Sequence, residues 1–401
     1  MKTSRIFSLQ ELTQEKVSHE LEAIVREMKE AENLFAPQLA MLHDNFKLSG
    51  TNLIHYLVMR SNEIRESQEY LHHLGLSSLT NSESHTMSHL FKVLHWLNLQ
   101  QDRARINPPA CNFETAAKLR QMHAEQLLGF FPARERPHIM VTFSSELMQH
   151  RMLVEEMLKE GMSVVRINCA HDSPVEWLSM IQLLKNAVAK TGKNCKVYMD
   201  LGGPKIRIKK MAARQKHENK KLPVLEGTEL IICAAPEAIT SIKRKRRDHY
   251  DVLFVEPGEI ISMIRLGERI YFDDGKFEAK VIECTDKYAV VRIVRISTGK
   301  PFLKPEKGIN LPDSELKIAA LTEEDKANIP FICKHADMVG YSFVSHPEDI
   351  AQLRHEIGKY ATRHKPSIVL KIERLTAIQN LPALLMEGMK DEALGVMIAR
   401  G

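Results

Sequence analysis

Several polar residues of the chain follow directly after short runs of apolar residues. They stand in four segments: Arg166-Ile-Asn-Cys-Ala-His171, Asp200-Leu-Gly-Gly-Pro-Lys-Ile-Arg207, Lys371-Ile-Glu373 and Ala399-Arg-Gly401. If each apolar run is a strand, these groups lie at strand ends, and parallel strands present such ends at one edge of their sheet. The sequence therefore predicts a polar site built from segments that lie far apart along the chain.

Lys371 and Glu373 carry the most specific chemistry among these groups. They stand two residues apart at the end of an apolar run, so in a strand they project on the same side. A carboxylate beside an ammonium suits a metal ligand next to a phosphate clamp, and phosphoryl transfer depends on positioning and charge neutralisation. An ordinary network of ion pairs at the edge of the sheet explains the same residues without catalysis, and both interpretations stay open.

Composition excludes several classes of protein. The chain has 401 residues, 44% of them hydrophobic and 27% charged, which is typical of a globular protein of two or three domains at about 150 residues each. A net charge of +5 is too mild to indicate nucleic-acid binding. With no secretory signal and no run near the roughly 18 apolar residues of a membrane span, we expect a cytoplasmic protein without a membrane partner.

Cysteine usage argues against metal fingers and disulfides. The six cysteines form no C-x-x-C pair, so the sequence contains no motif that would indicate a zinc finger or a thioredoxin-like redox site. In a reducing compartment we expect free, mostly buried thiols.

Two regions of the chain alternate between short apolar runs and amphipathic segments. The predicted strands are His138–Phe143, Ser163–Ile167, Cys195–Asp200, Asp337–Tyr341, Ser367–Ile372 and Leu394–Ile398. The predicted helices between them are Glu146–Glu160, Pro174–Lys190, Glu323–Lys334, Pro347–Tyr360 and Leu375–Glu387. This order predicts an α/β protein whose core is an incomplete TIM-type β/α barrel, with six strands rather than eight.

An all-β segment interrupts this alternation. Residues 205–312 are turn-rich, with predicted strands at Glu229–Cys233, Arg269–Phe272, Lys280–Glu283 and Ala289–Ile296. They predict an inserted all-β lid domain. The basic run 243–247 within it has the composition of a nucleic-acid patch, but no aromatic platform accompanies it, so we interpret it as a solvated loop.

The N-terminal region is predicted to be helical. One apolar stripe runs from Val17 to Phe35, a second helix spans residues 53–74 and ends at Gly75, a third follows a Thr80–Glu83 capping box, and a fourth follows Asn112. We therefore predict four segments: a helical domain at 1–132, the first part of the barrel at 133–204, the lid at 205–312 and the second part of the barrel at 313–401.

From about Arg136 to Gly401 the chain resembles pyruvate kinase. The strand-end segments carry the resemblance together with Asp273-Asp-Gly275, Lys307-Gly-Ile-Asn-Leu-Pro312, Asp337-Met-Val339 and Ser342-Phe343, all in the family's order. The resemblance implies transfer of a phosphoryl group from phosphoenolpyruvate to ADP, giving pyruvate and ATP, with magnesium as cofactor. It also implies that the insert is a mobile lid that closes on the nucleotide.

The resemblance assigns roles in catalysis and substrate binding. Lys371 matches the lysine that stabilises the transferred phosphoryl group and the enolate oxygen, and Glu373 matches a protein ligand of the catalytic magnesium. Arg136 and Arg166 match arginines near the phosphates. The backbone of Gly401 matches a substrate contact.

Other matches concern the nucleotide and a monovalent cation. His171 and Lys307 match nucleotide-binding positions, whereas Asn168 and Asp200 match ligands of the potassium ion that many family members require. Lys205 replaces a glutamate of the potassium-dependent members, and we expect its ammonium to take the place of the ion.

The chain also departs from the family's pattern. Ala170 and Leu201 replace the serine and threonine that are further potassium ligands, so we expect no requirement for potassium. Ser144-Ser145 replaces a Gly-Pro turn, and Arg374 replaces an asparagine.

The last residues match the family just before its second magnesium ligand. We therefore expect the chain as given to be inactive or nearly so, and to dissolve poorly, because a six-stranded sheet has open edges.

Two other functions remain open at this stage. One is a different barrel enzyme acting on pyruvate or phosphoenolpyruvate, such as a lyase, which would need the carboxylates but not the lid. The other is a non-catalytic protein whose helical domain binds a partner. The sequence also leaves self-association open, and we expect no nucleic-acid partner.

Overall fold

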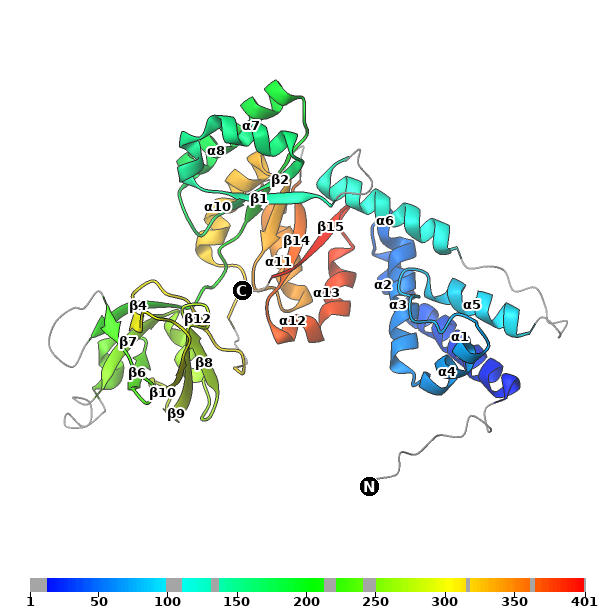
Figure 1. Ribbon diagram of the computed structural model, residues 1–401, viewed down its shortest axis with the longest axis horizontal. Helices are drawn as coiled ribbons and strands as arrows, with labels where there is room; N and C mark the ends of the chain where they lie inside the picture. The colour runs from blue at the N-terminus through cyan, green and yellow to red at the C-terminus, as the bar shows by residue number, and fades with distance from the viewer. Residues whose placement is uncertain are drawn as a thin grey trace.

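A parallel sheet of six strands forms the centre of the molecule. The computed structural model describes residues 13–98, 110–130, 137–212, 221–240, 250–314, 318–360 and 365–399. The sheet has the order β1-β2-β3-β13-β14-β15, and every neighbouring pair is parallel. Its strands are β1 (Ile139–Phe143), β2 (Met162–Asn168), β3 (Lys196–Asp200), β13 (Met338–Tyr341), β14 (Ser367–Ile372) and β15 (Leu394–Ile398). Figure 1 shows this sheet as a curled half-barrel, which confirms the predicted fold class.

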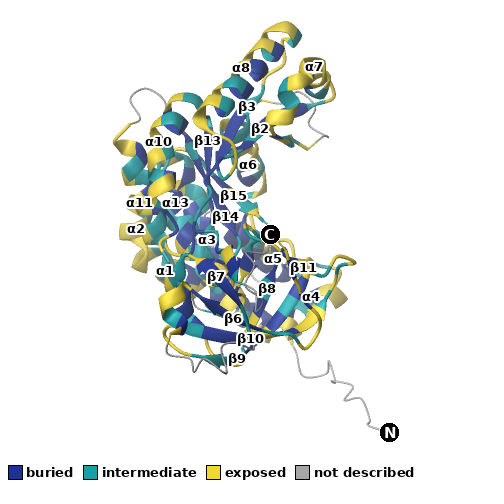
Figure 2. Ribbon diagram, turned by 90° about the vertical axis from the view of Figure 1, so that its left-hand side faces the viewer, coloured by how far each residue is buried: buried dark blue, intermediate teal, exposed yellow. Residues whose placement is uncertain are grey.

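One face of this sheet packs against helices. The helices are α7 (Arg151–Lys159), α8 (Pro174–Thr191), α10 (Glu323–His335), α11 (Pro347–Gly358), α12 (Leu375–Gln379) and α13 (Leu381–Gly388). Alternate strand residues such as Ile167, Met199 and Leu370 join the buried core beneath them. In Figure 2 the strands are mostly dark blue and the outer sides of these helices are yellow. Each strand therefore buries its helix-facing residues.

The other face of the sheet is covered at one end by an N-terminal helix. Leu127 and Leu128 of α6 (Phe113–Leu128) pack against Val164, Tyr198 and Val369, which lie on the inner side of their strands. The packing is tight, since a Cβ atom added at Gly395 of β15 would lie 2.8 Å from a methyl carbon of Leu127. The end of α6 thus packs against the inner face of the barrel segment.

The rest of the helical region surrounds its own apolar core. It contains α1 (Gln14–Leu34), α2 (Ala36–Ala40), α3 (Lys47–Ser61), α4 (Arg65–His73) and α5 (Thr86–Leu97). A second cluster joins Leu42, Phe46 and Leu53 to Met389 of the barrel segment and to Leu394 of β15. The helical region therefore contacts β15 through two separate apolar clusters. Among the described residues, no helix is both long and apolar enough to cross a membrane.

Two details of the predicted helices are wrong here. The single helix expected over residues 53–74 is divided into α3 and α4, because Asn62 adopts an extended conformation that ends α3. The Thr80–Glu83 capping box does not form, since α5 begins at Thr86 with His85 as its N-cap. The stop at Gly75 is confirmed: its φ is +70°, and the N–H groups of residues 75 and 76 bond back to the last turn of α4.

The barrel helices show two further differences. The expected helix 146–160 is a 3₁₀ turn (Ser145–Gln149) followed by α7, and the expected helix 375–387 breaks at Asn380 into α12 and α13. Pro382 lies in the first turn of α13, where its missing N–H is not needed.

The insert is a β domain with its own core. A seven-stranded sheet has the order β12-β8-β9-β10-β6-β7-β4. Its strands are β4 (Arg207–Ala212), β6 (Glu229–Cys233), β7 (Asp251–Glu256), β8 (Arg269–Phe272), β9 (Phe277–Cys284), β10 (Tyr288–Ile296) and β12 (Ile309–Asn310), and β5 (Leu222–Pro223) pairs separately with β11 (Phe302–Leu303). The sequence missed β4, β7 and β12 and the pair β5 and β11, and the basic run 243–247 lies outside the described residues.

We predict that Gly395→Ala destabilises the protein by about 1–3 kcal/mol, because its methyl group would overlap Leu127 and Val369. Gly358→Ala is the matched control, since a Cβ there meets nothing within 4 Å. Urea unfolding of both variants measures the difference. Equal unfolding midpoints would contradict the close docking of α6 on the sheet.

Candidate functional site

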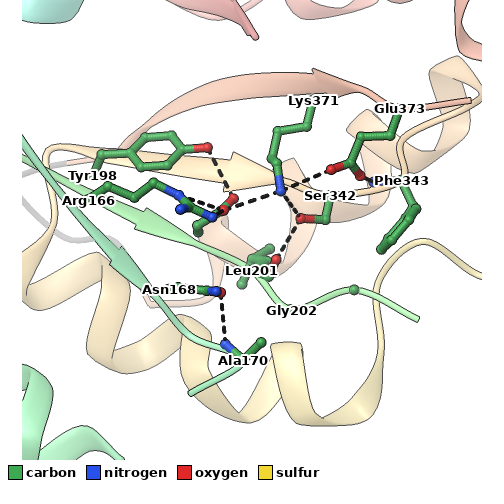
Figure 3. Close-up of polar contacts among 12 residues, drawn as sticks. Arg166, Asn168, Ala170, Tyr198, Leu201, Gly202, Ser342, Phe343, Lys371 and Glu373 are labelled. Carbon is green, nitrogen blue, oxygen red and sulfur yellow. Dashed lines mark hydrogen bonds and ion pairs between the residues drawn. The ribbon is translucent and has the colours of Figure 1, made fainter. Parts of the chain in front are cut away.

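The carboxyl ends of three strands bring four charged side chains together. Arg166 comes from the end of β2, Asp200 from the end of β3, and Lys371 from β14, with Glu373 directly after that strand. Figure 3 shows Arg166, Lys371 and Glu373 converging from these separate elements. The four side chains form one connected polar site.

Asp200 is the centre of this site. Only 1% of the residue is exposed. Its Oδ2 accepts hydrogen bonds from Arg166, with Nε at 3.0 Å, and lies 3.2 Å from Lys371 Nζ. Its Oδ1 accepts a hydrogen bond from the Tyr198 hydroxyl at 3.1 Å. Two cations and one hydroxyl therefore replace the water that this carboxylate loses on burial.

The ammonium group of Lys371 is held at a fixed point. The residue is 7% exposed, and Nζ lies 3.2 Å from Asp200 Oδ2, 3.2 Å from Glu373 Oε1 and 2.8 Å from Ser342 Oγ. An ammonium has three donors, and these three acceptors match that number. Ser342 Oγ in turn donates to the carbonyl of Leu201 at 2.7 Å. The ammonium is thus oriented before any ligand binds.

Glu373 links Lys371 to the loop after β13. Its Oε2 accepts a hydrogen bond from the backbone N–H of Phe343 at 2.9 Å, and its side chain is 14% exposed. Phe343 has a φ of +59°, a conformation uncommon for a bulky residue. The Arg374 guanidinium lies 4.9 Å from the centre of the Phe343 ring.

Lys205 adds a positive charge without an ion-pair partner among the described residues. Burial lowers the pKa of its ammonium, and the nearby charges of Arg207 and Lys371 lower it further, while Asp200 and Glu373 act in the opposite direction. Lys205 forms no ion pair with Asp200, because the cations that contact Asp200 are Arg166 and Lys371.

Asn168 is turned toward the chain that follows it. Its Oδ1 accepts a hydrogen bond from the N–H of Ala170 at 3.2 Å, as Figure 3 shows. The two residues expected at a monovalent-cation site, Asn168 and Asp200, thus both have side-chain oxygens engaged by donors of the protein. Neither Ala170 nor Leu201 adds a side-chain oxygen.

The contacts given by the described residues join neither of the expected nucleotide-binding residues to these four charges. His171 is exposed, and its carbonyl accepts a hydrogen bond from Trp177 Nε1. Lys307 belongs to the insert, where its Nζ lies 2.9 Å from Asp273 Oδ1. Burial acts to raise the pKa of Asp273, but its hydrogen bonds to Lys307 and Lys276 outweigh that effect and lower it.

Two of the residues expected to bind substrate, Arg136 and Gly401, lie outside the described residues. The sequence also missed one contributor to the site, Tyr198. Tyr198 stands two residues before Asp200, so the two side chains project on the same side of β3. This spacing is the sequence signal that could have placed Tyr198 at the site.

The donor set is compatible with magnesium. Mg²⁺ binds oxygen and keeps several waters, so it needs only one or two protein carboxylates beside substrate oxygens. The described residues contain no group of three or more His, Cys, Asp or Glu side chains that could hold a metal by themselves. Glu373, a partly exposed carboxylate beside a fixed ammonium, fits such a shared site.

The fold and the site define a class of protein: a β/α barrel segment with an inserted β domain and a lysine held between carboxylates at its strand ends. A family model described as the barrel domain of pyruvate kinase matches residues 135–401. The chain therefore belongs to the pyruvate kinase family.

Individual relatives agree with this assignment. A pyruvate kinase of Staphylococcus haemolyticus is 28% identical over 250 residues, 62% of this chain and 39% of the relative. One from Geobacillus stearothermophilus is 28% identical over 247 residues, 61% of this chain and 38% of the relative. One from Agaricus bisporus is 30% identical over 246 residues, 60% and 42% respectively. The matched part thus spans about two fifths of these relatives.

We predict that Asp200→Asn destabilises the protein by about 3 kcal/mol, since Arg166 and Lys371 would lose their shared buried counter-ion. Tyr198→Phe removes only a neutral donor from the same carboxylate and should cost about 1 kcal/mol. Urea unfolding distinguishes the two. A loss for Asp200→Asn no larger than that for Tyr198→Phe would show that the charge of Asp200 is not needed for stability.

Proposed function

We propose that this chain carries the phosphoryl-transfer centre of a pyruvate kinase, which converts phosphoenolpyruvate and ADP to pyruvate and ATP. The observation that supports it most is the buried ammonium of Lys371, held between the carboxylates of Asp200 and Glu373. A cation fixed in advance stabilises developing negative charge without the cost of reorganising water at the moment of reaction. Lys371 is therefore the catalytic residue of this proposal.

Arg166 would bind the phosphate of the substrate. Its Nε and Nη2 are bonded to Asp200, and its Nη1 donates to Thr142 Oγ1 at 3.1 Å. Because its side chain is 27% exposed, the guanidinium remains accessible to a ligand. Asp200 is then a positioning residue, since it orients both Arg166 and Lys371 and is only 1% exposed.

Magnesium, held by Glu373 together with substrate oxygens, would neutralise the charge that phosphoenolpyruvate and ADP bring into the site. The residues of this chain perform the other tasks. Lys371 faces the enolate oxygen and the phosphoryl group, whereas His171 and Lys307 contact the nucleotide. The insert carries Lys307 toward the strand ends and, when closed, excludes water.

An assay of pyruvate formation, with and without ADP, tests this function. Pyruvate that forms only with ADP supports a kinase, and pyruvate that forms without ADP supports a lyase or a phosphatase-like reaction instead. Since we expect this chain to turn over weakly, calorimetric titration with phosphoenolpyruvate and Mg²⁺ accompanies the assay and measures binding independently of turnover. Failure of both measurements would leave a non-catalytic role for the protein.

In a form of the protein that turns over, we predict that Lys371→Met lowers kcat by about a thousandfold or more, while the affinity for phosphoenolpyruvate falls far less, because the ammonium acts mainly on charge that develops in the transition state. Lys190→Met, at an exposed lysine paired with Glu155, is the matched control and should keep full activity. If Lys371→Met turns over like the control, the site is a structural ion-pair network.

We also predict that the activity is independent of potassium. Lys205 lies within electrostatic reach of Asp200 and Glu373 and supplies one positive charge without binding an ion. Lys205→Glu should lower activity in potassium-free buffer and gain activation by added K⁺, whereas Lys276→Met in the insert should show no such gain. Titration of both variants and the unmodified protein with KCl measures this. Strong activation of the unmodified protein by K⁺ would refute the role of Lys205.

A further inference from the structure

The insert is connected to the barrel segment by two stretches of chain. The outgoing stretch runs from the end of β3 through Gly202 and Gly203 to β4, and the returning stretch leads from β12 to Thr322 at the start of α10. Figure 1 shows the insert extending away from the half-barrel beyond these connections. Any movement of the insert therefore depends on where each stretch is held.

One buried carboxylate contacts both stretches. Asp325 stands in the first turn of α10 and is 2% exposed. Its Oδ1 accepts a hydrogen bond from the N–H of Gly202 at 3.0 Å, and its Oδ2 accepts one from the N–H of Gly203 at 3.2 Å. The same Oδ2 accepts hydrogen bonds from the N–H of Thr322 at 3.1 Å and from its hydroxyl at 2.7 Å.

The bonds to Thr322 are an ordinary capping box, but those to the glycines are not. A capping box satisfies donors at the start of its own helix. Asp349 does this for α11, where its Oδ2 accepts the N–H groups of Ser345 and His346. Asp325 additionally captures two amides that lie 122 and 123 residues earlier in the sequence. This extra contact needs an explanation beyond helix capping.

The glycines that Asp325 holds also contact the candidate site. Gly203 has a φ of +65°, and a Cβ there would lie 2.7 Å from the Phe343 ring and 3.0 Å from Ser342 Cβ. The N–H of Phe343 is bound by Glu373, and the hydroxyl of Ser342 is bound to Lys371. A displacement of Gly203 would therefore disturb the loop that orients both site residues.

We propose that Asp325 is a positioning residue that fixes the base of the lid: it fastens the outgoing and returning stretches to one point beside the phosphoryl-transfer site. On the outgoing side the lid then pivots beyond Gly203. On the returning side, Ala320 is already buried in the barrel core. Lys205, two residues after Gly203, consequently keeps its place near Asp200 and Glu373 while the lid moves.

This inference rests on the proposed function only in treating the insert as a lid. Its test is hydrogen–deuterium exchange of the purified protein, which requires no turnover. In the unmodified protein the amides of Gly202 and Gly203 should exchange slowly, and in Asp325→Asn they should exchange about tenfold faster or more, because they lose a charged acceptor. Fast exchange in the unmodified protein overturns the proposal, even if the variant fails to fold.

Asp349→Asn is the matched control, since it weakens the capping box of α11 without touching the lid connections. Its faster exchange should be confined to Ser345 and His346. Small-angle scattering should show a broader distribution of lid-to-barrel distances for Asp325→Asn than for Asp349→Asn. If the two variants have equal effects on the exchange rates of Gly202 and Gly203 and on the distance distribution, Asp325 acts only as a helix cap and the proposal is overturned. Slow glycine exchange in a protein that neither forms pyruvate nor binds phosphoenolpyruvate with Mg²⁺ would refute the function and leave the tether intact.

Discussion

The burial of one carboxylate, Asp200, at the end of β3 is the constraint on which the site depends. A carboxylate with 1% exposure is stable as an ion only where donors and cations replace its lost water. Arg166 from β2, Lys371 from β14 and the hydroxyl of Tyr198 meet this need. Arg166 and Lys371 come from opposite sides of β3. A shift in the register of either strand would therefore leave the buried charge of Asp200 without one of its partners.

The inner face of the sheet changes character along the strands. Toward their amino ends it is apolar, with Val164 and Val369 packed against Leu127 of α6. Toward their carboxyl ends it carries Arg166 and Lys371. The apolar end gives the strands a fixed partner, so that the charged end is held rigidly enough to orient an ammonium.

The site carries one more positive than negative charge, because Arg166, Lys371 and Lys205 stand against Asp200 and Glu373. Arg166 and Lys371 are paired, whereas Lys205 contributes a charge without an ion-pair partner in the described part of the chain. Such a balance favours ligands with several negative charges, as the proposed phosphoryl transfer requires. The pairing also explains why Lys371 keeps a defined position before any anion arrives, since Glu373 and Asp200 hold it from two directions.

The sequence by itself determined the parallel sheet, its six strands and the residues at their ends, because apolar runs, helix periodicity and the Lys371-Ile-Glu373 spacing are local signals. It did not determine which partners those residues find. The contact of Asp325 with Gly202, the docking of Leu127 on β15 and the hydrogen bond from Asn62 to Glu27 join segments far apart in the chain. Only the folded chain decides such contacts, because hydrogen bonding and packing between distant segments leave no periodic signal in the sequence.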